Sequence, residues 1–154
     1  MTIKRTVIAW AVAAIVLMPL PALAAVNCSI STVGVVFGTY DVFVPTVLAS
    51  TGSVTITCVG VGSGVDPVSV ALSSGNAGSF QPRTMLRSGE PLNYNLTLDA
   101  AGTMIWGDGT GGTQRFASVS NNKPVTITIY GRIPPGQDVS VGSYTDTITA
   151  TINF

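Results

Sequence analysis

The end of the chain, Tyr144 to Phe154, is the feature that most limits what this sequence can fold into. Its even positions carry mostly apolar side chains, and its odd positions carry Thr or Asn. A period of two is typical of a β-strand with one face buried and the other in water. The sequence therefore predicts a C-terminal strand within a sheet, whose far edge another strand must cover.

The same alternation recurs along the chain and predicts about six strands. The runs are VNCSISTVGVVFGTY (26–40, interrupted at its glycines), GSVTITC (52–58), VSVALSSG (68–75), LNYNLTLD (92–99), KPVTITIYGRI (123–133) and the C-terminal run. Residues 75–91 and WGDGTGG (106–112) are predicted to be connections. No stretch after residue 25 has a helical apolar stripe, so we expect an all-β fold. An immunoglobulin-like β-sandwich needs about seven strands, so this one is predicted to be incomplete and to lack the final strand.

The N-terminal segment is typical of a signal peptide. Lys4 and Arg5 precede an apolar run from residue 7 to residue 20, and Ala22-Leu23-Ala24 is a cleavage signature. We expect residues 1–24 to be removed and residues 25–154 to form one domain; a retained membrane anchor is the alternative, but prolines shorten the run below the ~20 residues of a span. Without Lys4 and Arg5, five basic residues face seven acidic ones, a net charge of −2. Nucleic-acid binding is therefore not expected.

The composition argues against an enzyme. The chain has no His, which removes the commonest general base and transition-metal ligand. Cys28 and Cys58 are the two cysteines, and in an exported chain a disulfide is favoured over a metal, redox or catalytic role. Asp108 offers one carboxylate among glycines, too few for Ca²⁺. We expect no catalytic residue, no metal site and no cofactor.

Several short motifs together resemble a known family. They are FGTY (37–40), GSVTITC (52–58), RTM (83–85) with LNYNL (92–96), WGDGT (106–110), YGRIP (130–134) with GQ (136–137), and GSYTDTITATINF (142–154). In this order they are similar to the spore coat protein U domain, which is shared with Csu-type pilins of the archaic chaperone–usher pathway. The resemblance covers Cys28 to Phe154.

The resemblance implies both a fold and partners. Pilins of this pathway are immunoglobulin-like sandwiches without the final strand, and the gap is a hydrophobic groove beside the C-terminal strand. A periplasmic pilus chaperone would fill it and grip the terminal carboxylate, and an outer-membrane usher would then exchange the chaperone strand for a strand of another pilin subunit. The groove role falls on Ile148, Ala150, Ile152 and Phe154, and the family's disulfide on Cys28 and Cys58. The protein would pass through the periplasm to a pilus (fimbrium) on the cell surface, or be secreted, and serve adhesion and biofilm formation.

One departure from the family concerns the N-terminal segment that a pilin of this pathway inserts into the groove of its neighbour. Only Ala25, Val26 and Asn27 precede Cys28 in the expected mature chain. Three residues span about 10 Å, too little to fill a neighbour's groove. We therefore expect a subunit that accepts a strand without donating one, at an end of a fibre such as its tip. A self-contained secreted or spore-coat structural protein is the alternative.

Overall fold

The computed structural model describes residues 26–60, 68–117 and 122–153, so the predicted signal peptide and Phe154 lie outside the described residues. Most of the elements in this part of the chain are strands, and one short 3₁₀ turn lies between the third and the fourth strand. In chain order the elements are β1 (Asn27–Val33), β2 (Leu48–Val59), β3 (Ser69–Leu72), η1 (Gly75–Ala77), β4 (Arg83–Arg87), β5 (Glu90–Thr97), β6 (Phe116–Ala117), β7 (Val125–Ile133) and β8 (Ala150–Asn153). In this part of the chain, no helix is long and apolar enough to span a bilayer.

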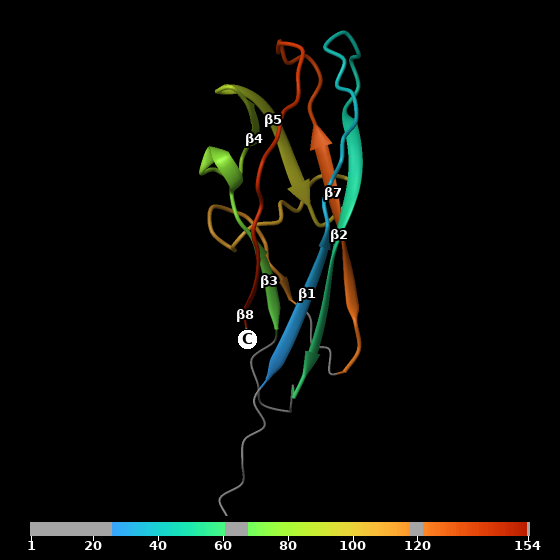
Figure 1. Ribbon diagram of the computed structural model, residues 1–154, viewed down its shortest axis with the longest axis vertical. Coiled ribbons are helices and arrows are strands. Elements are labelled where there is room, and N and C mark those ends of the chain that lie inside the picture. The colour runs from blue at the N-terminus through green and yellow to red at the C-terminus, as the bar shows by residue number, and fades with distance from the viewer. Residues whose placement is uncertain (1–25, 61–67, 118–121, 154) are drawn as a thin grey trace, which may run out of the picture.

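The strands form two sheets, and every named pair is antiparallel. The larger sheet has the order β1-β2-β7-β5-β4, and the smaller has the order β6-β3-β8. Figure 1 shows β3 and β8 to the left of the long β2 and β7 strands. The predicted all-β, immunoglobulin-like sandwich is confirmed.

The core lies between the sheets and follows the predicted alternation. In the larger sheet, Val54 lies opposite Ile127, and both side chains are buried. The smaller sheet contributes Val70 and Leu72, and Trp106 is fully buried with its indole N–H donating to the Val70 carbonyl at 2.9 Å. Because the inward residues of both sheets are apolar, burial of this shared face is what holds the layers together.

The prediction was wrong at residues 75–91, where the expected irregular connection contains a strand that forms a hairpin with β5. Arg83–Arg87 forms β4 and pairs with β5 across the turn at Ser88 and Gly89, both of which have positive φ. Alternation failed to reveal β4 because one of its inward positions is Arg83, which is fully buried. The short β6 was also missed.

A glycine in β7 shapes the interior next to β1. A Cβ at Gly131 would lie 2.6 Å from Val35 Cγ1 and 2.7 Å from Phe37 Cζ. Gly131 therefore leaves room for the segment that follows β1 to pack across the inner face of β7. The interruption predicted at Gly34 matches the end of β1 at Val33.

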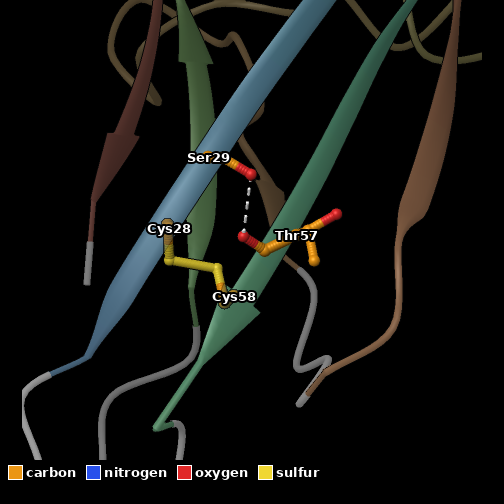
Figure 2. The surroundings of a disulfide bond; sticks show 4 residues. All are labelled: Cys28, Ser29, Thr57 and Cys58. Carbon is orange, nitrogen blue, oxygen red and sulfur yellow. Dashed lines mark hydrogen bonds between the residues drawn. A yellow bond between two sulfur atoms is a disulfide. The ribbon is translucent and has the colours of Figure 1, made fainter.

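The predicted disulfide is present at the opposite end of β1. Cys28 and Cys58 are directly opposite each other in the β1–β2 register, with Cα atoms 4.1 Å apart. Figure 2 shows the bridge and, on the neighbouring pair, the Ser29 hydroxyl donating to the Thr57 carbonyl. The bridge ties the outermost strand of the larger sheet to its neighbour.

Candidate functional site

The C-terminal segment is hydrogen-bonded along one edge. Thr145 exchanges two backbone hydrogen bonds with Leu86 of β4, at 2.9 and 3.1 Å. Further along, the Ser73 N–H donates to the Thr149 carbonyl at 2.9 Å, and β8 then pairs with β3. The predicted strand from Tyr144 therefore joins a regular ladder only from Ala150, because its partner changes from β4 at Thr145 to β3 further along.

The other edge of this segment is open. In an antiparallel ladder, successive residues direct their backbone groups to opposite edges. Since Thr145 and Thr149 face β4 and β3, the backbone groups of Asp146, Ile148 and Ala150 face away. Among the described residues, nothing hydrogen-bonds to the backbone N–H or C=O of Ile148. This edge can therefore accept a further strand.

The first strand, β1, offers a second open edge. The short Cα–Cα distance of Cys28 and Cys58 marks a pair without backbone hydrogen bonds, so the backbone groups of Cys28, Ile30 and Thr32 face away from β2. Ile30 points inward like its partner Ile56, yet Ile30 is 39% exposed and Ile56 only 2%. The inner face beside β1 is thus left uncovered.

A cleft of about 450 Å³ lies between these two edges. One wall is the stretch Thr32–Val35, and the other is Tyr144–Ile148 with Ala150. The floor consists of side chains from the sheets and from the segment after β1: Phe37, Val54, Leu72, Met85, Tyr94, Leu96 and Ile129. The cleft is apolar over most of its lining, and no Lys or Arg is among its described lining residues.

A pair of polar side chains interrupts this apolar lining. The Tyr94 hydroxyl donates to Asp146 Oδ2 at 2.7 Å. Burial, the hydrogen bond to Asp146 and the charge of that carboxylate raise the pKa of Tyr94 well above its usual range. Asp146 Oδ1 also accepts from the Asn76 and Thr147 N–H groups. Asp146 therefore holds the cleft wall against β5 and the η1 turn.

Behind Asp146, Arg83 is buried among carbonyl groups. Its guanidinium donates to the Ser73 and Trp106 carbonyls and to Asn95 Oδ1. Burial lowers the pKa of Arg83, and the charge of nearby Asp146 partly opposes this shift. The side chain thus joins the β3–β4 connection to β5 and to the loop at Trp106, which is a structural role.

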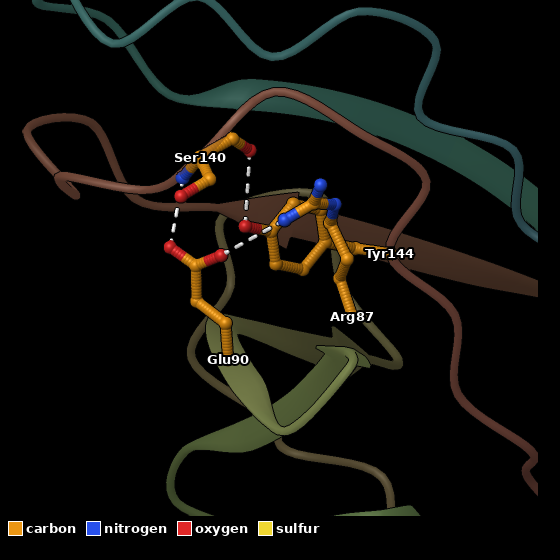
Figure 3. Close-up of polar contacts among 4 residues, drawn as sticks. All are labelled: Arg87, Glu90, Ser140 and Tyr144. Carbon is orange, nitrogen blue, oxygen red and sulfur yellow. Dashed lines mark hydrogen bonds and ion pairs between the residues drawn. The ribbon is translucent and has the colours of Figure 1, made fainter.

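A second polar cluster fixes the start of the same wall. Figure 3 shows Glu90 accepting from the Ser140 N–H at 2.8 Å and pairing with Arg87 at 3.5 Å, while the Tyr144 hydroxyl donates to the Ser140 carbonyl at 3.0 Å. The Ser140 N–H and the nearby Tyr144 hydroxyl lower the pKa of Glu90. Partial burial and Glu90 raise the pKa of Tyr144. The β7–β8 connection is thereby held on the β4–β5 turn.

The groove residues expected from sequence lie at different depths of this site. Ile148 and Ala150 line the cleft. Ile152 is half-buried on the inward side, opposite Val70 of β3, and is not among the lining residues described. Phe154 lies outside the described residues. The opposite wall, Thr32–Val35, was not predicted to belong to the site; the apolar residues around Gly34 were its only signal in the sequence.

The described residues offer little else for chemistry. Asp108 accepts hydrogen bonds from the Thr110 N–H and hydroxyl at 2.9 and 2.6 Å, as expected for a turn. Among the described residues there is no group of three or more His, Cys, Asp or Glu that could hold a metal ion. The site is therefore defined by shape, apolar surface and open strand edges.

The described residues thus form an incomplete β-sandwich with an apolar cleft between two open strand edges. Residues 14–151 match the family described as the Spore Coat Protein U domain, and the chain belongs to this family. The chain is also 32% identical over 130 residues to Protein U of Myxococcus xanthus, a match that covers 77% of this chain and 70% of that protein.

A solved structure shares the fold. It is the pre-assembly complex of the chaperone CsuC and the tip adhesion subunit CsuE from archaic chaperone–usher Csu pili of Acinetobacter baumannii. The similarity has a TM-score of 0.59 and 23% identity, and it covers 84% of this chain. This chain corresponds to 40% of the solved chain.

Proposed function

We propose that this protein is a structural or adhesive subunit of a bacterial surface fibre, assembled by donor-strand exchange at the cleft between β1 and the C-terminal segment. The observation that carries the proposal is the pair of open strand edges that face the same apolar cleft of about 450 Å³. An open edge beside apolar surface favours aggregation unless another strand covers it. The proposal assigns the protein no catalytic role.

The dimensions of the cleft suit an extended peptide. Its C-terminal wall runs from Tyr144 to Ala150, which is about 20 Å at ~3.3 Å per residue. A strand of this length directs three or four alternate side chains into the cleft. At about 1.5–3 kcal/mol for each buried side chain, such a strand contributes roughly 5–12 kcal/mol, which is comparable with the whole stability of a small domain.

The relatives suggest the partners. The solved complex pairs a subunit of the same fold with its chaperone, which supports a periplasmic pilus chaperone as the first occupant of the cleft. We infer that an outer-membrane usher then exchanges the chaperone strand for a strand of another pilin subunit. The protein would pass through the periplasm and end on the cell surface or in the medium.

We also propose a position at the end of a fibre. This rests on the predicted cleavage after Ala24, which would leave three residues before Cys28. A subunit of that kind accepts a donor strand and has no segment long enough to donate. The groove role proposed for Ile148, Ala150, Ile152 and Phe154 is that of the accepting wall.

A self-contained secreted or spore-coat structural protein is the second candidate. The 32% identity to Protein U of Myxococcus xanthus favours it. In that case the cleft would be filled within the mature protein, and the subunit would be stable without a partner.

One experiment separates the two functions. The full chain is exported to the periplasm with and without a co-expressed chaperone of the archaic chaperone–usher pathway, and the soluble fraction is examined by size-exclusion chromatography. Fibre assembly predicts degradation or aggregation without the chaperone and a soluble one-to-one complex with it. A stable monomer with a cooperative melt in the absence of chaperone would contradict strand acceptance.

The purified complex then allows a direct test of exchange. The probe is a synthetic peptide of about ten residues that alternates Ile or Val with Ser or Thr, long enough to span the cleft at ~3.3 Å per residue. The peptide should displace the chaperone, whereas copies of the subunit alone should not polymerise. Long homopolymers would contradict the end-of-fibre position.

A further inference from the structure

Three of the sequence motifs meet at one end of the cleft. They contain Tyr40, Asn93 and Gln137, which lie in FGTY, LNYNL and the GQ pair after YGRIP. In Figure 1 the β1–β2 connection, the β4–β5 turn and the β7–β8 connection are at the same end of the molecule. None of these three residues lines the cleft, so strand binding alone does not account for their meeting.

The side chain of Gln137 makes the hydrogen bonds to the backbone of Asn93 in β5 that a longer β7 would have made. Asn95 is paired with Arg132, so continued pairing would place Asn93 opposite Pro134. Proline has no N–H to donate, and β7 ends at Ile133. Instead, Gln137 Nε2 donates to the Asn93 carbonyl at 2.9 Å, and the Asn93 N–H donates to Gln137 Oε1 at 2.8 Å.

Tyr40 completes the link from the other side of the cleft. Its hydroxyl donates to the Pro134 carbonyl at 3.1 Å and accepts from the Gln137 N–H at 2.9 Å. Gln137 Nε2 also donates to the Pro134 carbonyl, at 3.2 Å. One hydroxyl and one amide thus join the β1–β2 connection, the β7–β8 connection and β5.

The link connects the two walls. Tyr40 follows the wall Thr32–Val35 by five residues, and Phe37 between them forms part of the floor and packs edge-on against Tyr94 with ring centroids 5.9 Å apart. Gln137 precedes Tyr144, where the other wall begins. Both hydrogen bonds described between the β1–β2 connection and the β7–β8 connection involve the Tyr40 hydroxyl.

We propose that Tyr40 and Gln137 are positioning residues that hold the two walls of the cleft at the separation a bound strand requires. This rests on the proposed strand-accepting function. The two residues touch no donor strand; they act through the chain segments on either side of it. Loosening the link should therefore speed release of a bound strand while the remainder of the sandwich keeps its stability.

The test uses the full mature chain in complex with the same alternating peptide, fluorescently labelled. Dissociation is started with excess unlabelled peptide and followed by anisotropy. Tyr40→Phe removes only the hydroxyl and should raise the dissociation rate about 3–10-fold, as expected for one or two lost hydrogen bonds. Gln137→Met removes both contacts to Asn93 and should raise it by about tenfold or more.

The control is Tyr130→Phe, the same chemical change at a Tyr whose hydroxyl makes no hydrogen bond among the described residues. It should leave the dissociation rate unchanged. Hydrogen exchange at Ile56 and Ile127 reports global stability; a purely structural role would raise exchange there together with peptide release, and that result would refute positioning. Equal release from Tyr40→Phe and the unmodified chain would also refute it. If the unmodified chain fails to bind the peptide, strand acceptance itself is wrong and this inference falls with it.

Discussion

Replacing Ile148 with Asp tests the proposed cleft most directly. Ile148 is half-buried, lines the cleft and points inward, and no Lys or Arg is among the described lining residues to pair with a new carboxylate. A strand laid over this position would remove water from an unpaired charge, which costs several kcal/mol. Loss of the isoleucine contacts adds to this cost. The sum is about 3–5 kcal/mol, which corresponds to a loss of strand affinity of roughly 10² to several 10³-fold.

The measurement is the dissociation constant of the labelled alternating peptide for the Ile148→Asp chain. Thr149→Asp is the matched control, because Thr149 is on the same segment with its side chain exposed on the opposite face. It should bind within about threefold of the unmodified chain, since exposed substitutions cost little.

A pH series adds an internal check on Ile148→Asp. Burial raises the pKa of a carboxyl group because it disfavours the charged form. Part of the lost affinity should therefore return as the pH falls towards 5. An Ile148→Asp chain that binds as tightly as Thr149→Asp at neutral pH would show that this wall is not where the strand lies.

Four further outcomes follow from other parts of the molecule. Cys58→Ser opens a bridge between residues 30 apart and should lower the free energy of unfolding in urea by about 3 kcal/mol. Arg83→Met leaves the Ser73 and Trp106 carbonyls without their buried donor, so it should cost roughly 2–4 kcal/mol in the same assay, and an unchanged midpoint would show that water replaces the guanidinium. The pKa of Glu90 is lowered in the folded protein, so its contribution to the free energy of unfolding is complete above the pKa of the unfolded chain and is lost as the pH falls through the lower pKa of the folded protein. Glu90→Gln should therefore make the melting temperature less sensitive to acid. Identical melting temperatures of the two chains across the acid range would count against this role. Intact mass of the exported protein should correspond to a chain starting at Ala25 and lacking two hydrogens, and two free thiols would contradict the oxidised form.

Local alternation was enough to predict much of the fold. The runs around Val54, Tyr94 and Ile127 place apolar residues at every second position, and each is a strand with those residues buried. β4 could not be predicted in this way. Its inward Arg83 is tolerated only because carbonyls from residues 73 and 106 surround it, and that surrounding arises from tertiary structure.

The site was predictable on one wall and not on the other. Period-two alternation identifies Ile148 and Ala150 as inward residues, because it depends only on neighbours along the strand. The wall Thr32–Val35 carries no comparable pattern, since the chain leaves β1 there to pack at Gly131. The link from Tyr40 to Gln137 joins residues 97 apart, so the motifs could mark these residues without indicating that they meet.

The placement of the C-terminal wall has a consequence for when the site comes into being. The Thr149 N–H donates to Ser73 Oγ across 76 residues, and Thr145 pairs with Leu86. β3 and β4 therefore gain these partners only after residues 145–149 have been synthesised. A truncated or still-emerging chain has no such wall. Under the proposed strand acceptance, a partner that binds this wall would distinguish chains that carry the C-terminal segment from chains that lack it.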